Sequence, residues 1–115
     1  MFRKSKPDGY TEVIEGVHLK TIVYGNQTLM VEVKFEKDAV IPPHGHPHEQ
    51  TGYLISGQLE FVVNGETIIA DPGDSWNIPG DVEHSAVAID ETVVIEVFSP
   101  VREDYLPYYT ADEDE

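Results

Sequence analysis

The sequence predicts an all-β protein, a double-stranded β-helix (jelly-roll) barrel. Two observations lead to this fold class. Strand-like segments of about 5 to 8 residues recur from Val17 to Phe98, and Gly, Pro, Asn or Asp interrupt them about every 8 to 12 residues. In addition, no window of about 11 residues shows the 3.6-residue period of an amphipathic helix. Closing the sheets into a barrel removes strand edges that a small domain cannot otherwise protect.

The first strands are predicted at residues 17–24 and 29–35, with Gly25 and Asn26 as turn residues between them. Apolar residues fill every second position of the later segment, the period of a strand with one buried face. The most definite local prediction is the hairpin of 58–63 and 66–70, because Asn64-Gly65 suits the two positive-φ positions of a type I′ turn. Two last strands are expected at 84–89 and 92–98, after turn clusters at 71–74 and 78–81.

We expect one domain over residues 1–115, with the barrel at about 17–100, a flexible N-terminal arm at 1–10 and an acidic tail at 112–115. Four residues before that tail are too apolar for a free chain end, and they are expected to pack on the barrel or on a partner: Tyr105, Leu106, Tyr108 and Tyr109. Because this apolar C-terminal segment and one sheet face would otherwise be exposed to water, a homodimer is predicted.

The composition excludes several classes of function. Seven basic against 22 acidic residues give a formal charge of −15, which argues against binding nucleic acid or an anionic membrane. The absence of cysteine excludes disulfides, thiolate metal sites and a cysteine nucleophile. Neither a signal-peptide pattern nor an 18-residue apolar run is present, so a cytoplasmic location is expected. The acidity fits a halophilic source or an ordinary acidic protein.

Histidines gather at one point of the sequence. His44, His46 and Gln50 have the same parity, so on one strand their side chains would face the same way, and His84 after a later turn could complete the set. Imidazole is the commonest protein metal ligand, so this pattern predicts a metal site. The alternative is a solvated loop with incidental histidines. His48 shares the parity, but its His-Pro-His context favours a place outside the ligand set.

The histidine pattern resembles the cupin superfamily. His44-x-His46, three residues, Gln50, six residues and Gly57 follow the first cupin motif, and Gly73, Pro79 and His84 follow the second. The resemblance implies a cupin barrel with one divalent ion per chain, and it leaves Ni, Zn, Mn and Fe open as the metal. The chain departs from the usual motifs at four positions, namely Gln50 for Glu, Ala39 for Gly, Asp81 for Gly and Ala88 for Asn.

Segments 30–36, 44–50 and 97–105 resemble more narrowly the pectin-degradation (KdgF-type) cupins. That resemblance implies conversion of 4,5-unsaturated monouronates, from pectin or alginate, to the linear 5-keto-4-deoxyuronate. It also implies His44, His46, Gln50 and His84 as the metal ligands. The active-site Asp, Phe and Arg of that group fall on Glu96, Phe98 and Arg102, so position 96 departs from the group by carrying Glu.

The residue types at those positions agree with an anionic sugar-acid substrate. If Val94 and Phe98 point inward, Glu96 does too, and a buried carboxylate near a metal needs a functional or ionic reason. Arg102 could grip a carboxylate bidentately, and Phe98 could form a wall against the sugar face. Trp76 and Tyr53 are further aromatic candidates, but core packing is the favoured interpretation for Trp76 and a role outside the site is favoured for Tyr53. Gly52 is expected at a turn or bulge.

Two other functions remain open from the sequence. A cupin of this size could be a metal-dependent dioxygenase, which would consume oxygen with bound iron or copper. It could also be a non-enzymatic cupin that binds a metal or a small ligand without turnover.

Overall fold

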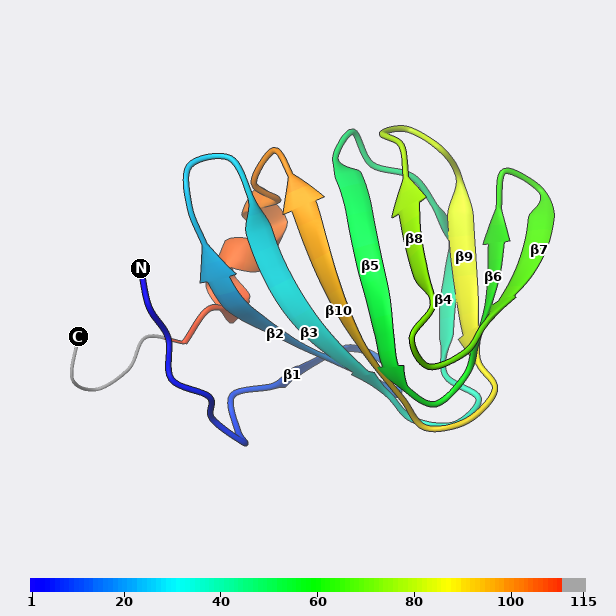
Figure 1. Ribbon diagram of the computed structural model, residues 1–115, viewed down its shortest axis with the longest axis horizontal. Helices are drawn as coiled ribbons and strands as arrows, with labels where there is room; N and C mark the ends of the chain where they lie inside the picture. Colours follow the sequence, from blue (N-terminus) through cyan, green and yellow to red (C-terminus); the bar gives the residue numbers. More distant parts are fainter. Residues whose placement is uncertain (111–115) are drawn as a thin grey trace.

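The computed structural model describes residues 1–110, and over these residues ten strands form two antiparallel sheets that face each other (Figure 1). One sheet has the order β1-β2-β3-β10-β5-β8 and the other the order β4-β9-β6-β7. The fold class predicted from the sequence is therefore confirmed. None of the helical segments in this part of the chain has the length and hydropathy needed to cross a membrane.

Six of the ten strands described by the structure, β2, β3, β6, β7, β9 and β10, follow the predicted segments closely. The hairpin is present as predicted, and the backbone at its turn has positive φ at both Asn64 (49°) and Gly65 (81°). The bounds are β1 Thr11–Ile14, β2 Val17–Tyr24, β3 Leu29–Phe35, β4 Val40–His44, β5 Glu49–Ser56, β6 Leu59–Val63, β7 Glu66–Ala70, β8 Ser75–Ile78, β9 His84–Ala88 and β10 Thr92–Ser99.

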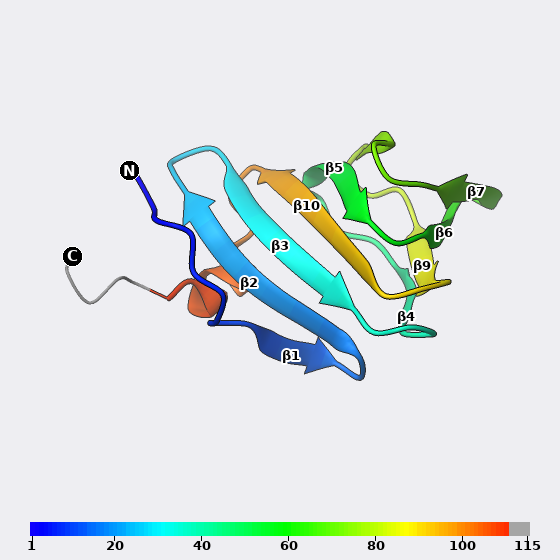
Figure 2. The same cartoon turned by 60° about the horizontal axis from the view of Figure 1, so that its bottom comes forward.

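Strand β10 lies in the middle of the six-stranded sheet, between β3 and β5 (Figure 2). Every second residue from Thr92 to Phe98 is buried between the sheets, as the alternation in the sequence predicts. Four of the largest fully buried side chains of the core come from β3, β5, β6 and β10: Leu29, Leu54, Leu59 and Phe98. The inner face of β10 thus carries both the core and, at Glu96, a buried carboxylate.

After β10 the chain packs on the barrel as the 3₁₀ helix η1, Glu103–Tyr108. Tyr105, Leu106 and Tyr108 pack against the core, and the ring of Tyr109 meets Tyr24 edge-on, with 5.0 Å between the centroids. The hydroxyl of Thr21 donates to the carbonyl of Tyr105 at 2.6 Å. These apolar residues therefore pack on the barrel of their own chain, which is one of the two outcomes expected from the sequence. The predicted acidic tail at 112–115 lies outside the described residues.

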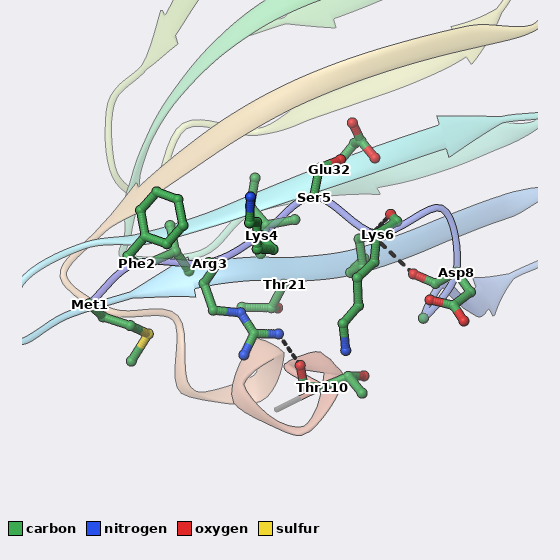
Figure 3. Close-up of a pocket in the computed structure, with 14 residues that line it drawn as sticks. Met1, Phe2, Arg3, Lys4, Ser5, Lys6, Asp8, Thr21, Glu32 and Thr110 are labelled. Carbon is green, nitrogen blue, oxygen red and sulfur yellow. Dashed lines mark hydrogen bonds between the residues drawn. The ribbon is translucent and has the colours of Figure 1, made fainter. Parts of the chain in front are cut away.

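The N-terminal residues run along β2 and are tied to it by hydrogen bonds. Lys20 Nζ donates to the carbonyls of Lys6 and Asp8, at 2.8 and 3.0 Å, and Arg3 donates to the hydroxyl of Tyr109 and to the carbonyl of Thr110. Between this segment and β2 lies a groove of about 390 Å³ (Figure 3). None of the residues that line the groove belongs to the predicted site, so the groove is separate from it.

Candidate metal centre and active site

The structure brings three histidines together at one end of the barrel. His44 ends β4 and His84 begins β9, and the two are direct partners across these strands. One ring nitrogen from each of His44, His46 and His84 can be chosen so that all three lie within 4.8 Å of one another, and His48 is not part of this group. The assumption that 44, 46 and 50 share one strand is wrong, because His46 lies in the connection between β4 and β5. The predicted convergence nevertheless occurs, because the chain turns there.

Backbone carbonyls fix the proton position in each of the three rings. Nδ1 of His44 lies 3.0 Å from the carbonyl of Pro42, Nδ1 of His46 lies 3.0 Å from that of His48, and Nδ1 of His84 lies 2.9 Å from that of Val82. A carbonyl oxygen can only accept, so Nδ1 carries the proton in all three rings. Each Nε2 is left with a free lone pair, which is the arrangement that second-sphere carbonyls create around metal-binding histidines.

The remaining polar atoms fit a cation. Nε2 of His84 is buried and has no hydrogen-bond partner among the described residues. Nε2 of His46 lies 3.0 Å from Oε1 of Gln50, so two electron-rich atoms face each other. The Gln50 amide has this orientation because its nitrogen donates to Glu96. A divalent ion among these atoms would relieve the repulsion and use the unpartnered nitrogen, so the donor set fits the metal that the sequence predicts.

Burial also keeps two of the histidines neutral. It lowers the pKa of His44 and of His46 below the usual value, and for His46 the positive charge of Arg102 acts in the same direction. Neutral imidazole is the form that binds a metal. The two rings therefore have free lone pairs at pH 7.

Glu96 is only 8% exposed and lies on the inner face of β10, as its parity with Val94 and Phe98 predicts. Its Oε2 accepts hydrogen bonds from the amide of Gln50 and, at 3.1 Å, from the indole nitrogen of Trp76. Burial raises the pKa of Glu96, while the two hydrogen bonds act in the opposite direction. A carboxyl group with a raised pKa keeps its proton to a higher pH than a solvated one, which suits a general acid or base.

Phe98 and Arg102 lie next to the histidines. The Phe98 ring is buried and meets His46 edge-on, with 5.7 Å between the centroids. The Arg102 guanidinium stacks over Tyr105 at 4.0 Å and over Phe98 at 5.0 Å, and its Nε donates to both carboxylate oxygens of Asp104. Among the described residues its two terminal nitrogens make no hydrogen bond. They are thus available for a substrate carboxylate.

Sequence reasoning underestimated Trp76. Trp76 packs on Phe61, as the favoured interpretation requires, but its indole N–H also reaches the candidate site through Glu96. Gly52 is not at a turn or a bulge. It lies within β5 opposite Trp76, where the indole crosses it. Tyr53 is 50% exposed on the outer face of β5 and does not join the site.

The fold and this arrangement of histidines define the class, and the comparisons agree: the chain belongs to the cupin domain family, whose sequence pattern matches residues 31–98. Within the family it is similar to the pectin degradation protein KdgF of Dickeya dadantii (strain 3937). The two are 35% identical over 99 residues, which cover 84% of this chain and 90% of that protein.

Two solved structures are also similar to this chain. KdgF from a Halomonas species superposes with a TM-score of 0.87 at 34% identity, covering 92% of this chain and 98% of the other. An RmlC-like cupin from Shewanella frigidimarina NCIMB 400 has a TM-score of 0.81 at 29% identity, covering 84% of this chain and 87% of the other. The resemblance to KdgF-type cupins found in the sequence is therefore confirmed.

Proposed function

We propose that this protein is a metal-dependent sugar-acid enzyme that converts 4,5-unsaturated monouronates to the linear 5-keto-4-deoxyuronate. The similarity to KdgF proteins along most of the chain supports a role in uronate breakdown. The observation that carries the proposal is the position of Glu96. A buried carboxylate contacts Gln50 beside three histidines. Arg102, whose terminal nitrogens make no hydrogen bond within residues 1–110, lies at the same end of the barrel.

In this proposal His44, His46, His84 and Gln50 hold one divalent ion. The ion would supply Lewis-acid polarisation of a substrate oxygen or of a water molecule. Arg102 binds the substrate carboxylate through its terminal nitrogens, since Asp104 occupies its Nε. Phe98, which is buried against His46 and beneath the Arg102 guanidinium, would support these two groups beside the sugar ring.

The reaction is an isomerisation, and its proton balance gives Glu96 a task. The substrate is an enol ether that also carries a hemiacetal. Opening the hemiacetal breaks the bond between C1 and the ring oxygen; the C1 hydroxyl loses its proton to give an aldehyde, and the ring oxygen gains one to give an enol. The enol becomes a ketone when C4 gains a proton and the enol hydroxyl loses one, so no proton is consumed overall. Alternatively, C4 gains the proton first, water adds at C5, and ring opening releases that water. In both orders of steps, Glu96 delivers the proton to C4.

The direct test follows the ultraviolet absorbance of the conjugated C4=C5 bond of an unsaturated monouronate. We expect the absorbance to disappear with the purified protein, to persist after chelation, and to disappear again when a divalent ion is restored. The product should have the mass of the substrate and no oxygen should be consumed. Oxygen uptake would instead indicate a dioxygenase, and metal binding without any turnover would indicate a ligand-binding cupin.

A further inference from the structure

Trp76 reaches the candidate site because of the residue that lies between it and Glu96. In the register of the six-stranded sheet, Glu96 on β10 pairs with Gly52 on β5, and Gly52 pairs with Trp76 on β8. Gly52 has no side chain, so the indole crosses over it and places Nε1 3.1 Å from Oε2 of Glu96. A Cβ atom at position 52 would overlap Nε1 of Trp76. The contact thus depends on one row of three residues across three strands.

The two oxygens of Glu96 have different surroundings. Oε2 accepts from both Gln50 and Trp76. Oε1 has no hydrogen-bond partner among the described residues. Two donors on one oxygen fix the plane of the carboxylate and leave the other oxygen available for proton transfer.

The two donors differ in how firmly they are held. The Gln50 amide also faces His46 through Oε1, so its position depends on what the histidines bind. The Trp76 indole packs against Phe61, with 4.7 Å between the centroids, and its N–H has no other partner among the described residues. Trp76 is therefore the donor whose position is set by the barrel core.

We propose that Trp76, reaching across Gly52, is a positioning residue that holds Oε2 of Glu96 and leaves Oε1 as the oxygen that transfers the proton. This inference rests on the proposed function, because it gives Glu96 its orientation for that reaction. Trp76 does not touch the substrate in this arrangement. It acts through Glu96.

The kinetic test compares two variants at neighbouring rings. Trp76→Phe keeps a ring against Phe61 but removes the N–H, and we expect kcat to fall by about 10- to 100-fold with KM little changed. Phe61→Leu loosens the same packing and leaves the N–H in place, so kcat should stay near that of the wild type even if the protein melts earlier. Wild-type kcat in a folded Trp76→Phe protein would overturn the proposal.

The spectroscopic test needs no turnover. Trp76 is the single tryptophan of the chain, so a ¹H–¹⁵N spectrum has one indole N–H resonance. In the wild type this resonance should exchange slowly with deuterium. It should shift and exchange faster in Glu96→Ala and in Gly52→Ala, which would displace the indole. Phe61→Leu is again the control, with the resonance near its wild-type shift.

The two tests separate this inference from the proposed function. If the wild-type protein does not turn over the uronate, the proposed function fails and the positioning is judged by the indole resonance. If the wild type turns over but the indole resonance is the same in Glu96→Ala, Trp76 does not hold Glu96 and the inference fails alone.

Discussion

His44 and His84 are direct partners across β4 and β9, and their ring centroids lie 4.2 Å apart. Both belong to the four-stranded sheet, whereas Gln50 approaches from β5 in the six-stranded sheet. A metal bound by His44, His84 and Gln50 would join the two sheets at this end of the barrel.

Metal content provides the first prediction. The purified protein should hold about one divalent ion per chain, at roughly 2.0 to 2.1 Å from the histidine nitrogens. His84→Ala should lose the ion, because it removes the buried and unpartnered Nε2. His48→Ala is the matched control and should keep it, since His48 stands outside the cluster. Elemental analysis measures both, and an His84→Ala protein with a full complement of metal would contradict the ligand set.

Removing the metal should also lower the thermal stability. An ion present at about 100 times its dissociation constant stabilises the folded state by about 2.7 kcal/mol, which corresponds to a Tm difference on the order of 10 °C for a chain of this size. Calorimetry with and without a chelator measures this difference. The His84→Ala variant should show no response to the chelator.

Glu96→Gln should remove most of the proposed uronate-linearising activity, by about 10²- to 10⁴-fold, because the amide cannot transfer the proton. The circular dichroism spectrum and the metal content should stay as in the wild type, since Glu96 is not among the proposed ligands. A wild-type rate in this variant would reject the role given to Glu96.

Arg102→Lys should raise KM by roughly 10-fold with a smaller effect on kcat, because a point charge replaces a planar pair of donors. Asp104→Asn is a useful companion, since it weakens the anchor at Nε but keeps the guanidinium. Its KM should lie between those of the wild type and Arg102→Lys. A KM unchanged in Arg102→Lys would place the substrate carboxylate elsewhere.

Tyr105 provides a prediction about alkaline pH. Burial raises the pKa of its hydroxyl to about 12, against about 10 in an unfolded chain. Between these pH values the folded protein keeps a proton that the unfolded chain releases, so the free energy of unfolding falls as the pH rises, by up to about 2.7 kcal/mol, and is unaffected below pH 10. An alkaline titration followed by tyrosinate absorbance should show one step at higher pH than the others. Tyr105→Phe should remove this step, and Tyr53→Phe, the control at an exposed tyrosine, should retain it.

We expect the chain to form a two-fold dimer. The C-terminal tyrosines are covered within the chain, so we place the dimer contact at one of the other exposed apolar surfaces, Tyr53 and Ile55 on the outer face of β5, which are 50% and 47% exposed. Ile68 and Ile69 on β7 are similarly exposed and form the alternative surface. Light scattering at micromolar concentration should give twice the chain mass, and Ile55→Glu should give a monomer. Ile69→Glu, on the other sheet, should leave the dimer intact.

Six of the strands were predictable from the sequence because alternation and turn chemistry are local, whereas their order in the two sheets was not predicted. The Asn64-Gly65 hairpin and the inward direction of Glu96 follow from neighbouring residues alone. β1, β4 and β8 were not predicted. The four residues of β1, Thr11–Ile14, are largely exposed and carry no alternation of apolar side chains, and β4 and β8 are also short, at five and four residues.

The residues of the candidate site were predictable from the sequence, but the way in which they come together was not. Parity suggested that His44, His46 and Gln50 converge, but a bend between β4 and β5 produces the convergence instead. The contact of Trp76 with Glu96 depends on the register of β8, β5 and β10, and register between strands distant in sequence is not visible in a single sequence. A glycine within a strand next to a possible site was the one available signal.

The hydrogen bond from Gln50 to Glu96 limits the order in which such a site can change by mutation. Replacing Gln50 by the glutamate usual in cupins would place two carboxylates in contact inside the barrel, and one of them would have to be neutral. Replacing Glu96 first by an apolar residue would leave the amide nitrogen of Gln50 without its acceptor. Positions 50 and 96 should therefore change together among related cupins, and either change alone should be less fit than both.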